Sequence, residues 1–162
     1  MTDTLPRTLW TLLTAGAFAT IAFDLFGQGL SPLAGFAKLA PVGLAQATLT
    51  TVFGSVPKGA ADTMHILTGL ILYPLGYFLI ARPLAARLTP WLHWSLVSVA
   101  YGVGLWIFAL YFVAHLIAGN PPFLGFTGIT WVALWGHILF AVVAAAVIER
   151  QAPRTAATPA LA

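Results

Sequence analysis

The chain has 162 residues, of which 60% are hydrophobic and only 7% charged, and its mean hydropathy is +0.93. This composition excludes a water-soluble globular protein and predicts several helices that cross a membrane. A net charge of +3 carried by seven basic residues is too small for a nucleic-acid-binding surface. The sequence contains no cysteine, which excludes disulfides, thiolate metal sites, iron–sulfur clusters and c-type haem.

The hydrophobic pattern predicts an all-α polytopic membrane protein, with four transmembrane helices in an antiparallel bundle and one short interfacial helix. The expected spans are residues 8–26, 63–81, 94–118 and 127–148, and the interfacial helix is residues 42–53 within an outer connection of residues 27–60. Residues 1–150 should form one membrane domain, followed by a disordered tail of residues 151–162.

Glycine and proline predict how the spans end and bend. Gly27, Gln28 and Gly29 should close the first span, and Pro74 should kink the second. The turn of residues 119–122 is short and uncharged, so the third and fourth spans should be antiparallel neighbours.

The basic residues predict the orientation in the membrane. Arg7, Arg82, Arg87, Arg150 and Arg154 fall on one side of the predicted spans, and only Lys38 and Lys58 fall on the other. By the positive-inside rule, both termini should be cytoplasmic.

Four ionisable side chains lie within the predicted spans, where such groups are costly and usually functional. They are Asp24, His65, His115 and His137. With about 1.5 Å of rise per residue, Asp24 and His65 lie about 3 Å and His115 about 5 Å from the outer ends of their spans. His137 lies about 15 Å deep by the same reckoning. By contrast, His93 stands between Trp91 and Trp94 and is expected at the inner interface.

Helical spacing places small, hydroxyl or aromatic residues on the faces that carry these four groups. His115 shares a face with Tyr111, Phe108, Gly104 and Tyr101, and His65 shares one with Gly69, Tyr73 and Tyr77. Asp24 is in line with Thr20, and His137 is in line with Thr130 and Ala133. All four ionisable groups are therefore expected to point toward the bundle interior.

Two kinds of ligand suit this set of residues. Asp24, His65, His115 and His137 could bind a divalent metal ion such as Cu, Zn or Fe. Alternatively, histidines on facing helices could be the axial ligands of a b-type haem, drawn from His65, His115 and His137, with Gly69, Gly102 and Gly104 leaving room for the macrocycle. Without any ligand, the same groups would serve as hydrogen-bonding partners between helices.

The segment His65-Ile66-Leu67-Thr68-Gly69 with Tyr73-Pro74-Leu75-Gly76-Tyr77, and the later Trp135-Gly136-His137, resemble small four-span bacterial inner-membrane proteins of unknown function. The resemblance covers the second to fourth spans. It implies a bacterial inner-membrane location and a four-helix architecture, and it implies no activity or ligand.

Three functional hypotheses follow. The first is a non-catalytic accessory subunit, beside an electron-transfer complex in the lipid bilayer, with a metal or haem site near the outer leaflet. The second is a small proton or metal-ion transporter or channel that uses Asp24 and the histidines. The third is a structural subunit that packs against other membrane-protein subunits and binds no ligand. An enzyme would require the predicted cluster to be a catalytic metal site, since no nucleophile or acid/base pair is evident.

Overall fold

The computed structural model describes residues 4–151, and these residues form helices and connections without any strand. Four continuous helical stretches among them are long and apolar enough to cross a membrane: Leu5–Leu33, Ala60–Leu88, Trp94–Ile117 and Gly128–Gln151. The predicted all-α fold with four spans is confirmed. Of the predicted tail, only Gln151 belongs to the described residues, and it ends the last helix.

The helical segments have the following bounds. The first stretch contains α1 (Thr4–Asp24), the π-helical segment η1 (Leu25–Leu30) and α2 (Ser31–Leu33), and it is followed by α3 (Pro41–Phe53). The second contains α4 (Ala60–Leu67), π-helical η2 (Thr68–Leu72), α5 (Tyr73–Gly76), π-helical η3 (Tyr77–Ala81) and α6 (Arg82–Leu88). The third contains α7 (Trp94–Ile107) and π-helical η4 (Phe108–Ile117), and the 3-10 segment η5 (Pro122–Phe126) leads into α8 (Gly128–Gln151).

The first stretch does not end at Gly27, as the sequence suggested, because η1 carries the helix onward. Gly27 is buried, and a Cβ atom there would collide with the side chain of Leu39. Gln28 donates a hydrogen bond from Nε2 to Asp24 Oδ1 at 2.8 Å, one turn earlier. The glycine therefore allows the following connection to pack against the helix instead of ending it.

The second stretch stays helical through Pro74, which is fully buried in α5. Proline cannot donate the usual helical hydrogen bond, and its ring crowds the carbonyl group one turn earlier. The π-helical segments η2 and η3 flank it on both sides. Such turns shift the hydrogen-bond ladder locally, and the sequence pattern gave no sign of them.

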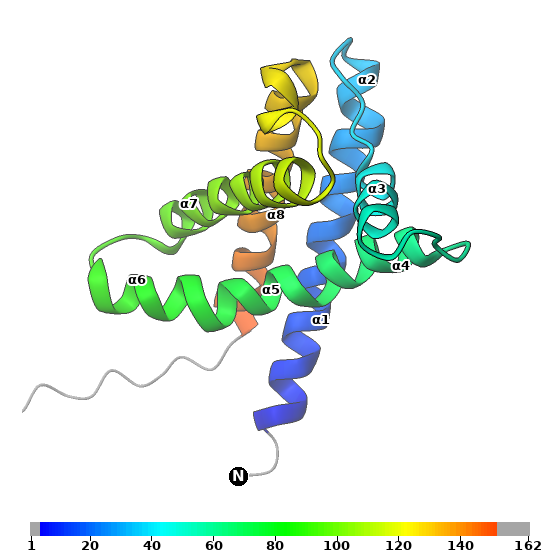
Figure 1. Cartoon of the computed structure of the whole chain (residues 1–162). Coiled ribbons are helices and arrows are strands. Elements are labelled where there is room, and N and C mark those ends of the chain that lie inside the picture. Colours follow the sequence, from blue (N-terminus) through cyan, green and yellow to red (C-terminus); the bar gives the residue numbers. More distant parts are fainter. Residues whose placement is uncertain (1–3, 152–162) are drawn as a thin grey trace, which may run out of the picture.

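Figure 1 shows the helices as two crossed pairs. The α1 and α8 helices run up the view side by side in opposite directions, whereas the α4–α6 and α7–η4 helices run across them. The α7 helix packs against α8, so the predicted contact between the third and fourth spans is confirmed. The small residues Ala15 and Ala19 of α1 and Ala141 and Ala144 of α8 are fully buried, as expected where helices approach closely within a membrane.

Gly102 allows α7 to approach the backbone of α8 closely. A Cβ atom at this position would lie 2.6 Å from Cα of Ile138 and 2.8 Å from the carbonyl oxygen of His137. At Gly69, a Cβ atom would collide with the hydroxyl of Thr20. The expectation that Gly69 and Gly102 leave room for a macrocycle is therefore wrong, because neighbouring helices fill that space. Only Gly104 of the three has no atom within 4 Å of its Cβ position.

An ion pair joins α6 to the end of α8. Arg82 donates from Nε to Oε1 of Glu149 at 2.9 Å, and the Tyr77 hydroxyl donates to the same oxygen at 3.4 Å. The three side chains tie the crossing pair of helices together at the end where the α6–α7 connection lies.

Replacement of Gly102 by alanine should lower the free energy of unfolding by about 1–3 kcal/mol, because the added methyl group meets the backbone of α8. The matched Gly104→Ala change, two residues along the same helix, should be neutral or stabilising by up to about 1 kcal/mol. Thermal unfolding in detergent measures both. Equal melting temperatures for the two variants would contradict the packing described here.

Candidate functional site

A cavity of about 620 Å³, here called the central cavity, lies between the crossed helices and is partly open to the surface. Side chains from α1, α3, the second helical stretch from α4 to η3, α7 and η4, η5, and α8 line it, and most of them are apolar. Its lining includes Thr20, Leu44, His65, Tyr73, Leu105 and His137. Its size falls in the range of about 300–1,000 Å³ that is typical of small-molecule sites, and apolar walls with a few polar groups are also typical of them.

Asp24 and His65 form a hydrogen-bonded pair across α1 and α4. Nε2 of His65 lies 3.1 Å from Oδ1 and 3.2 Å from Oδ2 of Asp24. Because a carboxylate oxygen accepts, Nε2 of His65 is the donor of this hydrogen bond. The Asp24 side chain is 29% exposed and that of His65 is 15% exposed, so the pair lies at the edge of the protein interior.

His137 is held differently, in the middle of α8. Its side chain is 6% exposed, and Nδ1 donates to the carbonyl oxygen of Ala133 at 2.7 Å. The carbonyl can only accept, so Nδ1 carries the proton and Nε2 has the lone pair. Within residues 4–151, Nε2 has no hydrogen-bond partner. An imidazole fixed by a backbone carbonyl through one nitrogen, with the other nitrogen free, has the arrangement of a metal-ligating histidine.

Phe23 separates the two histidines of the central cavity. Its ring centroid lies 6.4 Å from that of His65 and 5.2 Å from that of His137, in an edge-on contact with the latter. Tyr73 packs on His137 with centroids 6.3 Å apart. His65 and His137 thus line one cavity with an aromatic ring between them.

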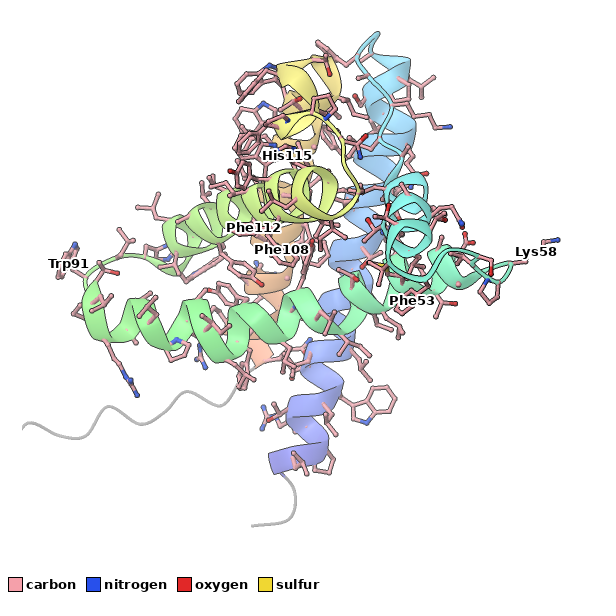
Figure 2. All side chains as sticks on the ribbon, viewed as in Figure 1. Phe53, Lys58, Trp91, Phe108, Phe112 and His115 are labelled. Atoms are coloured by element: carbon pink, nitrogen blue, oxygen red, sulfur yellow. The ribbon has the colours of Figure 1, made fainter. Side chains whose placement is uncertain are left out.

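His115 takes part in the connection after η4 and does not line the central cavity. Its Nδ1 donates to the carbonyl oxygen of Asn120 at 2.7 Å, and its ring lies 5.5 Å from that of Tyr111. Figure 2 shows it close to this connection, at the end of the third stretch. Because η4 is π-helical, the spacing of three and four residues used to assign faces does not hold there, and His115 leaves the face of Phe108 and Tyr101.

The four predicted metal ligands are therefore not gathered into one site. The structure pairs Asp24 with His65, places His137 beyond Phe23 and places His115 in another environment. Across residues 4–151, no group of three or more His, Asp or Glu side chains is positioned to hold a metal ion. The depth of a residue along its helix can be estimated from the sequence. Whether two residues at the same depth come together depends on how the helices cross, and the sequence does not give the crossing.

The turn that closes the cavity beside α8 has unusual backbone angles. Phe123, Leu124 and Phe126 have φ values of 49°, 53° and 54°. The left-handed conformation costs roughly 1–2 kcal/mol for each such residue. The Thr130 hydroxyl donates to the carbonyl oxygen of Phe123 at 2.5 Å and holds the turn, and Leu124 lines the central cavity.

Thr20 supplies a polar group whose importance the sequence did not reveal. Its side chain lines the central cavity and is 8% exposed, and its hydroxyl is a buried polar group without a hydrogen-bond partner within the described part of the chain. A threonine hydroxyl in a helix usually bonds to a carbonyl one turn earlier, as Thr48 does with Leu44 at 2.8 Å. Sequence spacing placed Thr20 on the face of Asp24 but could not show that its hydroxyl is unpaired.

Comparison with protein-family models, curated proteins and solved structures finds no match for the chain.

Replacing Thr20 by valine should raise the free energy of unfolding of the ligand-free protein by about 1–3 kcal/mol, because it removes an unpaired buried hydroxyl. The matched Thr48→Val change, also at a buried residue of the cavity wall, should lower it by about 0.5–1.5 kcal/mol because it removes a made hydrogen bond. Melting temperatures in detergent distinguish the two. A loss of stability in Thr20→Val as large as that in Thr48→Val would show that the Thr20 hydroxyl has a partner.

Proposed function

We propose that this protein is an integral membrane accessory subunit that holds a b-type haem in the central cavity, with Nε2 of His137 as a ligand of the iron. The proposal rests on the hydrogen bonding of the two ring nitrogens of His137. Its Nδ1 proton is committed to Ala133, and its Nε2 lone pair is free in a largely apolar cavity. Iron in haem is commonly held by a single protein histidine of this kind.

Haem is favoured over a bare divalent ion by the number of protein ligands that each needs. A zinc, copper or iron ion without a macrocycle takes three or four protein ligands, which residues 4–151 do not gather at one place. A haem brings four ring nitrogens of its own and needs one or two side chains. The Phe23 ring, which packs against both imidazoles, favours ligation by His137 alone, with His65 kept on Asp24.

The surroundings suit an apolar macrocycle with charged edges. The walls supply apolar contacts, and Tyr73 packs against His137 in a tilted contact and edge-on against Phe140. At the rim, the exposed Lys38 directly precedes the lining residues Leu39 and Ala40. A lysine there could pair with the propionate groups of a haem. The exposed aromatic residues Trp131 and Trp135 would contact lipid or the larger electron-transfer subunits that we propose as partners.

A second candidate function, a small proton carrier, is favoured by the position of the Asp24–His65 pair. Asp24 and Gln28 lie on an open, shallow part of the surface along α1 and η1, while His65 lines the central cavity. The pair thus lies between this surface and the cavity. Proton flux into vesicles that contain the haem-free protein, abolished by Asp24→Asn, would favour this function over the first.

We propose a bacterial inner-membrane location with both termini in the cytoplasm. Figure 1 shows the start of α1, the α6–α7 connection and the end of α8 toward the lower left, and the connections around α3 toward the upper right. Arg7, Arg82, Arg87 and Arg150 belong to the first group, whereas Lys38 and Lys58 belong to the second. The arrangement of charges supports the orientation expected from the positive-inside rule.

The haem proposal predicts that protein purified in mild detergent, from cells supplied with haem, shows a Soret band with about one haem per chain. His137→Ala should lose the band, and added imidazole should restore it, because imidazole can replace the missing ligand. His93→Asn is the control: His93 is exposed, caps α7 and lies outside the cavity. A haem-free wild type, or an unchanged spectrum in His137→Ala, would overturn the proposal. A wild type with no ligand of any kind would instead favour the structural-subunit hypothesis.

The orientation predicts that reporter domains fused after Arg87 and after Gln151 both report the cytoplasm, and that one inserted between Gly54 and Lys58 reports the opposite side. The physical reason is the excess of arginine on one side of the spans. A reporter after Arg87 that is found outside would reverse the orientation.

A further inference from the structure

Several side chains that line the central cavity are also exposed at the protein surface. Leu72 is 59% exposed, Ile80 is 65% exposed and Phe108 is 49% exposed. Leu72 and Ile80 belong to the second helical stretch, whereas Phe108 begins η4 of the third. The cavity is thus open sideways between these two stretches. We call this opening, bounded by Leu72, Ile80 and Phe108, the portal.

The packing of the helices explains why the portal is there. The two stretches pack on each other where η3 and α6 meet α7, close to the α6–α7 connection. Toward their other ends they diverge, and α3 packs against both α4 and η4. Between these two contacts, side chains and not helix backbone form the wall of the cavity. Figure 2 shows Phe108 between the two helices that run across the view.

Both helices that border the portal are long and apolar enough to cross a membrane. Their exposed apolar side chains therefore face the lipid tails, and the portal opens into the bilayer. A molecule that reaches the cavity by this route must dissolve in the membrane.

The inner end of the cavity differs from the portal in polarity. His137 lines the central cavity and is 6% exposed, and within residues 4–151 its Nε2 has no hydrogen-bond partner. The portal residues are all apolar. A cavity that is apolar at its membrane opening and has one unpaired nitrogen inside suits an amphipathic occupant with an apolar body and one coordinating or hydrogen-bonding group.

We infer that the central cavity is loaded laterally from the bilayer, through the portal, with a membrane-dissolved amphiphile. The inference rests on the proposed function in naming haem as that amphiphile, since haem combines an apolar macrocycle with an iron that His137 can ligate. The route itself depends only on the portal residues and on the membrane that surrounds them.

The absence of native cysteine allows the portal to be closed reversibly. In a Leu72→Cys, Phe108→Cys double variant, bifunctional thiosulfonates of graded length should link the two helices across the opening. Uptake of haem from haemin-loaded donor vesicles by the apo-protein in acceptor vesicles should then slow at least tenfold. Reduction of the link should restore the rate, and the final spectrum should be unchanged.

Each single-cysteine variant treated with the same reagent is a control, as is a linked Leu79→Cys, Ile107→Cys pair, whose positions are exposed but lie outside the cavity lining. Haem uptake at an unchanged rate in the linked portal variant would overturn lateral loading. That outcome leaves the haem proposal standing, because the spectrum still reports the bound haem.

A second measurement tests the portal without haem. Bimane attached to Leu105→Cys, a buried residue of the cavity wall, should be quenched by dibromostearic acid in the bilayer, saturably and at a low mole fraction of the acid. Bimane on Val97→Cys, equally buried on α7 but outside the cavity, should not be. Leu44→Cys on α3 provides a second wall position if Leu105→Cys fails to fold. Equal quenching at the cavity-wall and control positions would contradict the existence of the portal. Saturable quenching in a protein that binds no haem would reject only the proposal that the occupant is haem.

Discussion

The close approach of the helix backbones at small residues is the constraint on which the rest of the structure depends. At Gly102, α7 lies almost on the backbone of α8, and at Gly16 a Cβ atom would collide with the carbonyl oxygen of Leu70. Without a hydrophobic driving force between helices in lipid, such close contacts are a main source of association. They also fix the crossing of the helices. Helices that touch at small residues while they cross must diverge on either side of the contact, and the central cavity occupies the space between them.

Some polar groups in the membrane-spanning helices have a hydrogen-bond partner, and others do not. The Tyr101 hydroxyl donates to the carbonyl oxygen of Tyr73 at 2.7 Å, and Nε1 of Trp106 donates to that of Thr130 at 3.0 Å. An unpaired polar group in hydrocarbon costs several kcal/mol, so the sequence is expected to pair each one. The Thr20 hydroxyl, which is packed against Gly69, and Nε2 of His137 both lack a partner within the described residues. Of the two, His137 offers a free nitrogen on the lining of the central cavity, and a ligand would use that nitrogen.

Much of the architecture was predictable from the sequence. Runs of apolar residues long enough to span a bilayer fixed the number of spans, and the helical spacing within the outer connection indicated α3 to within one residue. The extent of the first span was not predictable, because the burial of Gly27 depends on Leu39, a residue of the following connection. In a single sequence, a glycine of this kind predicts the end of a helix. Only the packing in the structure shows that Gly27 instead allows a close contact with Leu39.

The candidate site was predictable only in part. Depth along the spans placed Asp24 and His65 at one level, and the structure joins them at 3.1 Å. The same reckoning placed His115 beside them, but η4 is π-helical, which rotates that residue toward Asn120. His137 was predicted to lie deeper than the others, as a fourth ligand or as a partner of the ligands, and it lines the same cavity as His65. Phe23, which separates the two cavity histidines, has no sequence signal beyond being one aromatic residue among many in an apolar span.

The central claim is that the cavity around His137 holds a haem that reaches it through the membrane. Native mass spectrometry of the protein released directly from its own membranes tests this claim most directly, because no ligand is added and none is selected by the experimenter. The account predicts a complex whose mass exceeds that of the chain by one haem, and a His137→Ala protein without this addition. A wild-type protein that leaves the membrane as the bare chain, or that carries haem equally well without His137, would contradict it.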